Sequence, residues 1–481
     1  MKLIKNYIGG EWFDGINGAW LDNINPATGD LIGKIPYSAE SDIAKAVEAS
    51  KSAFIMWAKT TAQERCNIML KIADGIDQNL EELALAETED TGKPLYISKS
   101  LDIPRAAANF RFFATAAVQF SSESHDMPGL AINYTLRQPI GIVGCISPWN
   151  LPLYLFTWKI APVLAAGNCV IAKPSEMSPT TAFLLSKICH NAGLPAGVLN
   201  ILHGLGSTCG EAIIRHPDIK AISFTGGTQT GARIASIAGP MFKKLSLELG
   251  GKNPCLVFDD CDYEATLAEV IRLAFSNQGQ ICLCGSRILI HKSMYDVFRD
   301  DLVDRANKLK VGDPLLHDTR IGAVVSASHR DKILSYIDLA REEGGHILCG
   351  GASYSPTGRC EKGFFITPTI IEGLGPECRT NTEEIFGPVI TLQSFETEEE
   401  AVTLANASSY GLASSLWTAD LSRAHRISPK LNTGIVWVNC WLLRDLRTPF
   451  GGMNDSGVGR EGGLEAMRFF TEAKNICVKY S

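Results

Sequence analysis

The sequence predicts an α/β protein that contains two parallel sheets. Strand-like and helical segments alternate from about residue 134 to 249 and again from 254 to about 440, which is the pattern of β-α-β units. The chain of 481 residues is too long for one ordinary hydrophobic core, so we expect two or three domains. Its content of 45% hydrophobic and 20% charged residues is that of a globular protein.

The first quarter of the chain is expected to become helical after a short β-rich start. Residues 1–40 predict short strands and turns, with a turn signal in the run NPATG at 25–29. From residue 41 onward apolar residues recur at helical spacing, and Ser41 is placed to cap the first helix. This spacing predicts helices over residues 41–57, 62–79, 80–91 and 103–118.

The first alternating run begins with strand-like residues at 134–147. Three pairs then follow, each a strand and then a helix: 169–172 with 178–191, 198–202 with 207–215, and 221–224 with 228–238. A last strand at 245–249 closes the run. Successive strands of this kind are parallel and are joined by right-handed connections.

The second run contains helices that we expect at 263–278, 293–309 and 328–343. The C-terminal segment FFTEAKNICVKYS, residues 469–481, predicts a single exposed strand. An exposed strand edge needs a partner. We expect this strand to pair with residues 130–137, either within the chain or across subunits.

Composition excludes several classes of partner. The net charge of −7 and the lack of a basic cluster exclude a nucleic-acid-binding surface. No apolar run approaches the ~18 residues that span a bilayer, so no membrane partner is expected. The N-terminus MKLIKNYIGGEWFDG breaks at Gly9-Gly10 before the apolar core of a signal peptide develops. These features predict a cytoplasmic protein.

The 14 cysteines are scattered and form no framework of short spacings. In a chain of this length they indicate free thiols in a reducing compartment. Cys282 and Cys284 are the one close pair, and no second pair or His-rich stretch completes a zinc pattern. No metal site is expected.

The first candidate for chemistry is Cys282, in the stretch FSNQGQICLCGSR at 275–287. A turn-prone run after an apolar helical segment can hold a thiol at the floor of a cleft. The thiol reacts as a thiolate, which requires a lowered pKa or a nearby base. The alternative for this stretch alone is an inert buried cysteine.

Two other candidates follow apolar strands. In SPWNLP, the amide of Asn150 can donate to a developing oxyanion, and the alternative is an asparagine that stabilises a turn. In LELGG, Glu248 ends a strand and is followed by glycines that allow close approach. Its apolar context predicts a raised pKa, suited to a general base, and the alternative is a structural ion pair.

Two stretches offer side chains to a nucleotide. In IAKPSE, Lys173 can donate hydrogen bonds to ribose hydroxyls and Glu176 can accept them. The Glu176 carboxylate also repels a 2′-phosphate, which favours NAD over NADP. In EEIFGP, Glu384 is a second hydroxyl acceptor and Phe386 can lie against the cofactor.

Glycine-bearing stretches can face a pyrophosphate. No GxGxxG motif follows a strand, which excludes an ordinary Rossmann phosphate loop. Two looser stretches each open a helix, and the free N–H groups of a helix N-terminus bind anions. They are GSTCG, with Gly206 and Gly210, and FTGGT, with Phe224, Gly226 and Gly227.

Together and in this order, these stretches resemble the aldehyde dehydrogenase superfamily. ELGGK and FSNQGQIC are highly specific in combination, and the resemblance covers essentially the whole chain. It implies two Rossmann-like parallel-sheet domains and a small β oligomerisation element, in a homodimer or homotetramer. By this resemblance the NAD-binding domain is 1–118 with 139–249, the catalytic domain is 250–446, and the oligomerisation element is 119–138 with 465–481.

The resemblance implies a role for each catalytic candidate. Cys282 is the expected nucleophile, and Glu248 is the expected base that activates water. Asn150, with the backbone N–H of Cys282, is the expected oxyanion hole. Cys284 is expected to be a spectator, because only one cysteine occupies the motif position.

The resemblance also implies an NAD site. Trp149 is expected to lie along the cofactor, with Lys173, Glu176 and Glu384 on its ribose hydroxyls. Gly227 stands where many members have a serine near the pyrophosphate. One hydroxyl contact is therefore lost, although the helix N-terminal N–H groups remain.

The stretch NCWLLRDLR at 439–447 bears on the substrate. A buried unpaired guanidinium is costly, whereas a substrate carboxylate pairs with it bidentately. With DIPRAAANFRFFA and ISPWNLPLYLFTWKIAP, the stretch resembles the muconic semialdehyde dehydrogenases. This resemblance implies Arg111, Arg444 and Trp158 as substrate-binding residues. Arg447 is a third candidate, with a surface ion pair as its alternative.

The expected reaction is the NAD-dependent oxidation of 2-aminomuconate 6-semialdehyde to 2-aminomuconate, a step of tryptophan breakdown through kynurenine. The alternatives are 2-hydroxymuconate semialdehyde from catechol meta-cleavage, retinal or another apolar aldehyde, a CoA-acylating variant, and a non-catalytic relative. The presence of both Cys282 and Glu248 argues against the last two.

Overall fold

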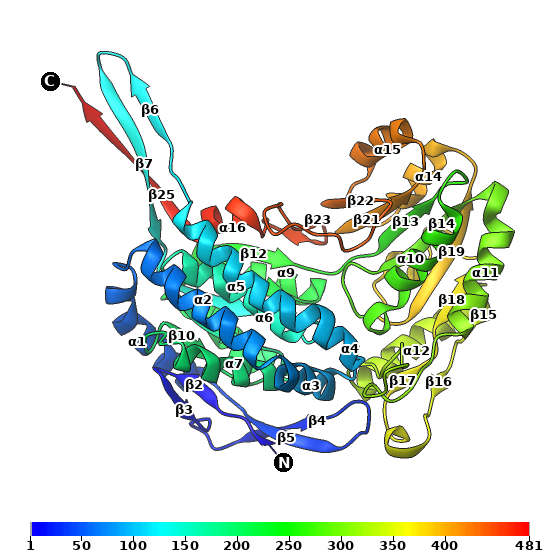
Figure 1. Ribbon diagram of the computed structural model, residues 1–481, viewed down its shortest axis with the longest axis horizontal. Coiled ribbons are helices and arrows are strands. Elements are labelled where there is room, and N and C mark those ends of the chain that lie inside the picture. Colours follow the sequence, from blue (N-terminus) through cyan, green and yellow to red (C-terminus); the bar gives the residue numbers. More distant parts are fainter. Residues whose placement is uncertain (1, 481) are drawn as a thin grey trace.

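The computed structural model describes residues 2–480 and contains two sheet-centred parts, with an arm that projects from one of them (Figure 1). Among these residues the first sheet has the strand order β24-β12-β11-β8-β9-β10-β2-β3. Its parallel centre consists of β8 (Ile142–Ile146), β9 (Cys169–Lys173), β10 (Leu199–Ile201), β11 (Ile219–Thr225) and β12 (Lys244–Glu248). Antiparallel strands β2 (Asn6–Ile8), β3 (Glu11–Phe13) and β24 (Gly457–Val458) extend its edges.

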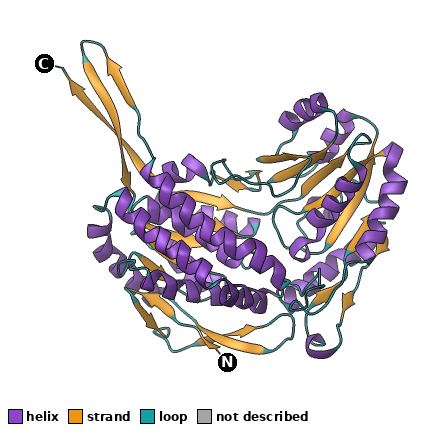
Figure 2. Ribbon diagram, in the orientation of Figure 1, coloured by secondary structure: helices purple, strands orange, loops and turns teal. Residues whose placement is uncertain are grey.

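Helices cover both faces of this sheet (Figure 2). Successive strand residues point to opposite faces, so Val143 and Cys145 pack in one hydrophobic cluster and Ile142 and Ile146 in another. The first cluster includes α2 (Ala62–Gln78), α3 (Leu80–Thr91), α5 (Ile103–Val118), α6 (Pro152–Ala165) and α7 (Thr180–Asn191). The second includes α1 (Glu40–Trp57), α8 (Glu211–Arg215) and α9 (Thr228–Ala238). Burial on both faces explains the nearly continuous apolar character of these strands.

The second sheet has the order β15-β18-β19-β14-β13-β21-β22 and is parallel except for β15. Its strands are β13 (Asn253–Val257), β14 (Gly285–His291), β15 (His346–Cys349), β18 (Thr369–Glu372), β19 (Val389–Phe395), β21 (Ala413–Trp417) and β22 (Ile435–Val438). Its helices include α10 (Tyr263–Phe275), α11 (Tyr295–Asn307), α12 (Ala327–Glu342), α14 (Glu398–Ala405) and α15 (Leu421–Ile427). The predicted α/β fold with two parallel sheets is confirmed.

The arm consists of β6 (Ser124–Met127), β7 (Ala131–Pro139) and β25 (Thr471–Lys479), which project together from the first part (Figure 1). β25 pairs antiparallel with β7 over its whole length, from Thr471 opposite Pro139 to Lys479 opposite Ala131. The predicted pairing of the C-terminal strand is therefore confirmed, and it forms within one chain.

Three details of the predicted elements are wrong. Helix α1 begins at Glu40 rather than Ser41, because the carboxylate of Asp42 accepts a hydrogen bond from the N–H of Ala39. The helix expected at 207–215 starts as a π turn, Gly206–Gly210, before α8. Helix α10 ends at Phe275 instead of continuing to 278, because Asn277 takes a positive φ of 51°.

The division into domains stays a prediction. The sheets separate near the predicted boundary at residue 249, since β12 belongs to the first sheet and β13 to the second. However, β24 returns from residues 457–458 to the first sheet, outside the range expected for the NAD-binding part.

Candidate active site

Cys282 lies in a tight segment between α10 and β14. Asn277 has a left-handed backbone, and Gly279 approaches Gly387 so closely that a Cβ would lie 2.0 Å from its carbonyl oxygen. On the other side, Nδ2 of Asn253 donates to the carbonyl of Cys282 at 2.6 Å. These contacts fix the backbone of Cys282 from both sides.

Two cavities meet at Cys282. One is a groove that is lined by, among others, Trp149, Thr225, Gly226, Glu384 and Phe386. The other is a largely apolar cavity that is lined by, among others, Arg105, Tyr154, Glu248, Arg444 and Phe450. Cys282 lines both. The arrangement suits a reaction at the sulfur between two molecules that enter from different sides.

Asn150 is buried between β8 and α6 and is held on three sides. Its Nδ2 donates to the carbonyl of Gln280 at 2.8 Å, which ties it to the segment of Cys282. Its own carbonyl accepts from Nδ2 of Asn277 at 3.0 Å and from Nζ of Lys93 at 2.9 Å. The second N–H of the amide is left for a ligand near Cys282.

Lys93 belongs to a fully buried charged cluster beneath Asn150. Its ammonium contacts Oε1 of Glu87 at 3.2 Å and Oδ2 of Asp102 at 2.5 Å. Glu87 also accepts from the N–H of Leu153 at 3.2 Å, at the start of α6. Burial raises the pKa of Glu87 to about 8, against the opposing charge of Lys93. The cluster therefore fixes the backbone from the carbonyl of Asn150 to the N–H of Leu153. The sequence carried no signal for it.

Glu248 ends β12 and lies in the same cavity as Cys282. Its side chain is buried, and Oε1 has no hydrogen-bond partner among residues 2–480. Burial, with help from the negative charge of Glu461, raises its pKa well above that of an ordinary carboxyl. Glu461 itself is held by Nζ of Lys159 at 3.0 Å. Glu248 thus has the raised pKa that the sequence predicts for it.

The Cys282 thiol does not have a lowered pKa. Burial raises it, the carboxylates of Glu384 and Glu248 raise it further, and Arg444 opposes them. The thiolate must therefore form by proton transfer to a base. The Cys284 thiol donates to the carbonyl of Ser276, with its Sγ 3.8 Å from the oxygen.

The groove has the features of a nucleotide site where α9 begins. Gly227 caps the helix without a side-chain hydrogen bond, and a Cβ on it would meet no atom within 4 Å. A Cβ on Gly226 would lie 2.4 Å from the ring of Phe224, so only glycine fits there. The free N–H groups of this helix open into the groove and can bind a pyrophosphate.

The opposite wall of the groove is formed by Glu384 and Phe386. Oε1 of Glu384 accepts from the N–H of Gly251 at 2.9 Å. The ring of Phe386 packs edge-on against Trp149, with centroids 5.4 Å apart. Phe386 has a positive φ of 63°, and its carbonyl accepts from Nε2 of His329 at 2.8 Å. Burial lowers the pKa of His329 to about 4, so the ring is neutral and carries its proton on Nε2. No motif in the sequence indicated a role for His329.

Lys173 and Glu176 lie together at the end of β9, where their side chains form an ion pair of 3.1 Å. Gly206 and Gly210 bound the π turn that precedes α8. A Cβ on Gly210 would lie 3.7 Å from Cδ of Lys173, so this turn borders the lysine.

Arg444 enters the cavity from the segment between β22 and α16 (Gly463–Phe469). Its guanidinium lies over the rings of Trp158 and Phe450, at 4.3 Å and 3.8 Å from their centroids. Nη1 donates to the hydroxyl of Tyr154 at 3.1 Å, whereas Nε and Nη2 are buried without a partner in the described chain. Buried donors of this kind can bind an anionic group of a ligand.

Arg111 does not bind in this cavity, and its expected role is wrong. It is 40% exposed on the surface, where Nη2 contacts Asp74 at 2.7 Å and Asp77 at 2.6 Å. Arg105 of the same helix lines the cavity instead. Six residues turn a helix by about 240°, so the two arginines face different sides. The apolar spacing of α5 contained the signal that separates them.

Two other residues that were considered as substrate contacts have different surroundings in the structure. Trp158 is absent from the cavity lining and is only 2% exposed, so it supports Arg444 from behind rather than touching a ligand. Arg447 forms the surface ion pair that was its alternative, at 2.6 Å from Asp445.

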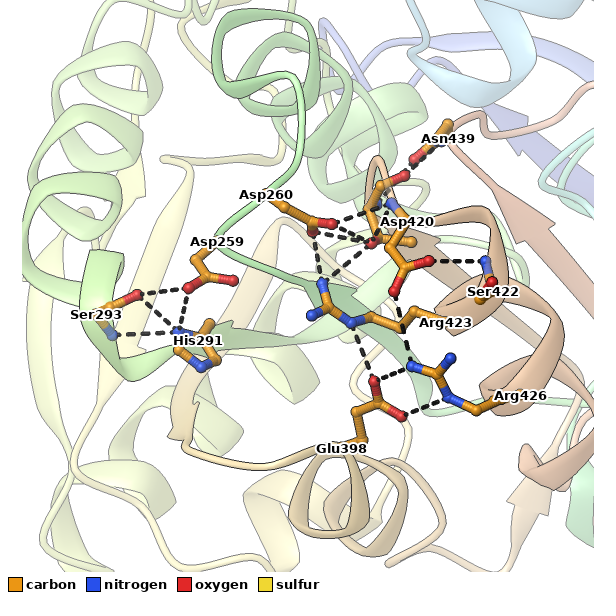
Figure 3. A network of polar contacts seen from close by, with 11 residues as sticks. Asp259, Asp260, His291, Ser293, Glu398, Asp420, Ser422, Arg423, Arg426 and Asn439 are labelled. Atoms are coloured by element: carbon orange, nitrogen blue, oxygen red, sulfur yellow. Dashed lines mark hydrogen bonds and ion pairs between the residues drawn. The ribbon is translucent and has the colours of Figure 1, made fainter.

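A polar network anchors the segment that carries Arg444 (Figure 3). Asp260 accepts from Oγ1 of Thr418 at 2.8 Å and from Nη1 of Arg423 at 2.7 Å. Asn439, where the segment begins, exchanges two hydrogen bonds with the backbone of Thr418, at 3.0 Å and 2.8 Å. The backbone of Asn439 is left-handed, with a positive φ of 52°.

Comparison with known proteins agrees with this site. The model of the aldehyde dehydrogenase family matches residues 12–476. The chain belongs to the aldehyde dehydrogenase family. The mouse 2-aminomuconic semialdehyde dehydrogenase is 47% identical over 481 residues, covering 99% of this chain and 98% of its own length. The 2-hydroxymuconic semialdehyde dehydrogenase of Pseudomonas sp. (strain CF600) is 43% identical and covered completely, as is this chain.

A solved NAD+ complex of an aldehyde dehydrogenase from Bacillus cereus shares the fold, with a TM-score of 0.97 and 36% identity over 100% of this chain and 97% of that one. Within residues 2–480, no helix combines the length and the apolar character needed to cross a membrane. The same residues contain no cluster of three or more His, Cys, Asp or Glu side chains arranged to hold a metal ion.

Proposed function

We propose that this protein oxidises 2-aminomuconate 6-semialdehyde to 2-aminomuconate with NAD. One observation carries the proposal: the cavity that contains Cys282 and Glu248 is also lined by Arg105 and Arg444. Neither arginine has a carboxylate partner in the described chain. A substrate with an aldehyde at one end and a carboxylate at the other matches this cavity. The names of the relatives, 2-aminomuconic and 2-hydroxymuconic semialdehyde dehydrogenase, support the same substrate class.

The reaction begins when Glu248 accepts the proton of the Cys282 thiol. The thiolate attacks the aldehyde carbon, and a C–S bond forms as the carbonyl electrons move to oxygen. The amide of Asn150 and the backbone N–H of Cys282 donate to that oxygen. NAD bound in the groove would supply the hydride acceptor for this carbon, so that Cys282 would be left carrying a thioester. Glu248 releases the thiol proton to solvent and, ionised again, takes a proton from water, whose oxygen attacks the thioester carbon and releases the acid and the Cys282 thiolate.

In this proposal the groove beside Cys282 would hold NAD. The N–H groups that follow Gly227 would bind the pyrophosphate, and Glu384, together with Lys173 and Glu176, would bind ribose hydroxyls. A Cβ on Gly250 would lie 2.4 Å from Oε2 of Glu384, so the glycine keeps this carboxylate in place. The charge of Glu176 disfavours the 2′-phosphate of NADP.

The second candidate substrate is 2-hydroxymuconate 6-semialdehyde, which is favoured by the relative from Pseudomonas. It carries the same carboxylate and the same aldehyde, and only an oxygen replaces the nitrogen. The arginines therefore accept both molecules, whereas they disfavour retinal or a fatty aldehyde.

NADH production distinguishes these substrates. The purified protein is given enzymatically generated 2-aminomuconate 6-semialdehyde, its 2-hydroxy analogue, and retinal. We expect kcat/KM to be highest for the amino compound and lowest for retinal. Equal or faster oxidation of retinal would contradict the proposal. Product formation that requires CoA would contradict the role of Glu248.

Assembly, domain division and location are part of the proposal. We expect the arm of β6, β7 and β25 and residues 119–138 with 465–481 to mediate a homodimer or homotetramer. The arm exposes the apolar side chains of Met127, Leu136 and Val478, which supports a role in assembly. All 14 cysteines are free, which supports the reducing environment of the cytoplasm.

A further inference from the structure

Tyr154 lies between the two cavity arginines. It belongs to the first turn of α6 and is largely buried in the cavity wall. Its hydroxyl oxygen accepts from Nε of Arg105 at 3.4 Å and from Nη1 of Arg444 at 3.1 Å. Both guanidinium groups therefore share this oxygen as a hydrogen-bond partner. Neither has another such partner in the part of the chain that the structure describes.

The hydrogen of the Tyr154 hydroxyl has no acceptor in the described chain. A phenolic oxygen has two acceptor sites and one hydrogen, and the two arginines occupy the acceptor sites. A guanidinium group cannot accept a hydrogen bond, so neither arginine can take the hydroxyl hydrogen, and no other acceptor for it is found within residues 2–480. The hydroxyl therefore has a free donor beside two guanidinium groups that form no salt bridge in the described chain.

Other groups cannot replace Tyr154 in holding Arg105. Arg444 is also fixed by its stacking on Trp158 and Phe450. Arg105, by contrast, has the Tyr154 ring, at 5.5 Å from its centroid, and the Tyr154 hydroxyl as its polar contacts in the described structure. Burial alone would raise the pKa of Tyr154, but the two arginines outweigh it and lower the pKa, which makes the hydroxyl a stronger donor.

We propose that Tyr154 determines specificity for substrates with a terminal carboxylate. Its oxygen holds Arg105 and Arg444 side by side, and its hydrogen is donated to the carboxylate that these arginines bind. The inference rests on the proposed function, because it assumes an anionic substrate in this cavity. It adds a third contact, which neither the motifs nor the alternation of strands and helices indicated.

Tyr154→Phe tests this inference, because it keeps the ring and removes only the hydroxyl. For 2-hydroxymuconate 6-semialdehyde, which is available by ring cleavage of catechol, we expect KM to rise about tenfold or more. For hexanal, a neutral aldehyde, we expect KM and kcat to change less than about twofold. The inhibition constant of muconate, a dicarboxylate that cannot react, should rise with the KM of the semialdehyde.

Two further variants separate the possible results. Tyr263→Phe is a control that removes a hydroxyl outside the cavity, which contacts Asp301. It should leave the KM and kcat of both substrates unchanged. Arg444→Ala tests the proposed function itself. If Arg444→Ala is selective for the anionic substrate but Tyr154→Phe is not, the inference on Tyr154 is overturned and the proposed function stands. Equal losses on both aldehydes in Tyr154→Phe would reduce the residue to a structural role and would also overturn the inference.

Discussion

The ammonium group of Lys93 donates a hydrogen bond of 2.9 Å to the carbonyl of Asn150. A fully buried side chain thus holds the residue whose amide is proposed to stabilise the oxyanion. The contact links α3, through Glu87, to the start of α6 and to the segment of Cys282.

Replacement of Lys93 should weaken catalysis through Asn150. We expect Lys93→Gln to lower kcat about 10- to 100-fold, because a misplaced oxyanion donor loses part of its effect. The affinity for NAD should stay nearly unchanged. In the background of Asn150→Ala, the same change should have little further effect on kcat.

Steady-state kinetics of the two single variants and the double variant measure this coupling. Lys99→Gln is the matched control, since Lys99 is partly exposed and paired with Glu81. Additive losses in kcat would show that Lys93 does not act through Asn150. A melting curve of each variant separates this effect from unfolding.

The charge of Glu461 should set the lower pH limit of activity. Glu248 acts as a base only when it is ionised, so kcat/KM rises with pH through the pKa of Glu248. Glu461 helps to raise that pKa. We therefore expect Glu461→Gln to move the acidic limb of the pH profile of kcat/KM to lower pH.

The control for this profile is Glu465→Gln, at an exposed position of the neighbouring helix α16 that pairs with Arg468. Its acidic limb should coincide with that of the unchanged protein. A limb that stays in place in Glu461→Gln, or moves to higher pH, would contradict the coupling between the two carboxyls.

Glu87 should make the protein less stable as the pH rises. Its pKa is raised from 4.5 to about 8 in the folded chain, so between these values the folded state binds a proton that the unfolded state has released. Stability from this group is complete below the lower value and is lost as the pH rises through the upper one. Glu87→Gln mimics the protonated form. Melting temperatures across this range should therefore fall less steeply in Glu87→Gln than in the unchanged protein, and an equal slope would argue against a protonated Glu87.

Cys282→Ala should abolish oxidation while the groove still binds NAD. The change removes the atom that forms the C–S bond, so we expect a loss of at least about a thousandfold in kcat. Quenching of tryptophan fluorescence by NAD measures binding, since Trp149 lines the groove. Cys284→Ala is the matched control and should keep most of the activity. Appreciable turnover in Cys282→Ala would refute its role as the nucleophile.

The sequence predicted features that depend on local patterns of residues. The alternation of strands and helices was sufficient to predict the two parallel sheets. The apolar strand that ends at Glu248 was sufficient to predict the raised pKa of its carboxyl. The strand at the C-terminus could be paired with residues 130–137 because an exposed edge has few ways to be satisfied.

The predictions that failed concern contacts between segments that are far apart in the sequence. Arg111 was assigned to the cavity by its place in a motif, although the helical spacing of α5 turns it outward and turns Arg105 inward. The end of α10 could not be placed because the approach to Gly279 comes from Gly387, in the distant loop that precedes β19. Lys93 and Tyr154 gave no signal, since their partners are dispersed along the chain.

The most direct measurement is the change in substrate preference on Arg444→Ala, with Arg111→Ala as its surface control. The ratio of kcat/KM for 2-hydroxymuconate 6-semialdehyde to that for hexanal should fall about 30-fold or more in Arg444→Ala, since a buried charged hydrogen bond is lost. It should stay unchanged in Arg111→Ala. An unchanged ratio in Arg444→Ala, or a fall as large in Arg111→Ala, would contradict the binding of a carboxylate in the Cys282 cavity.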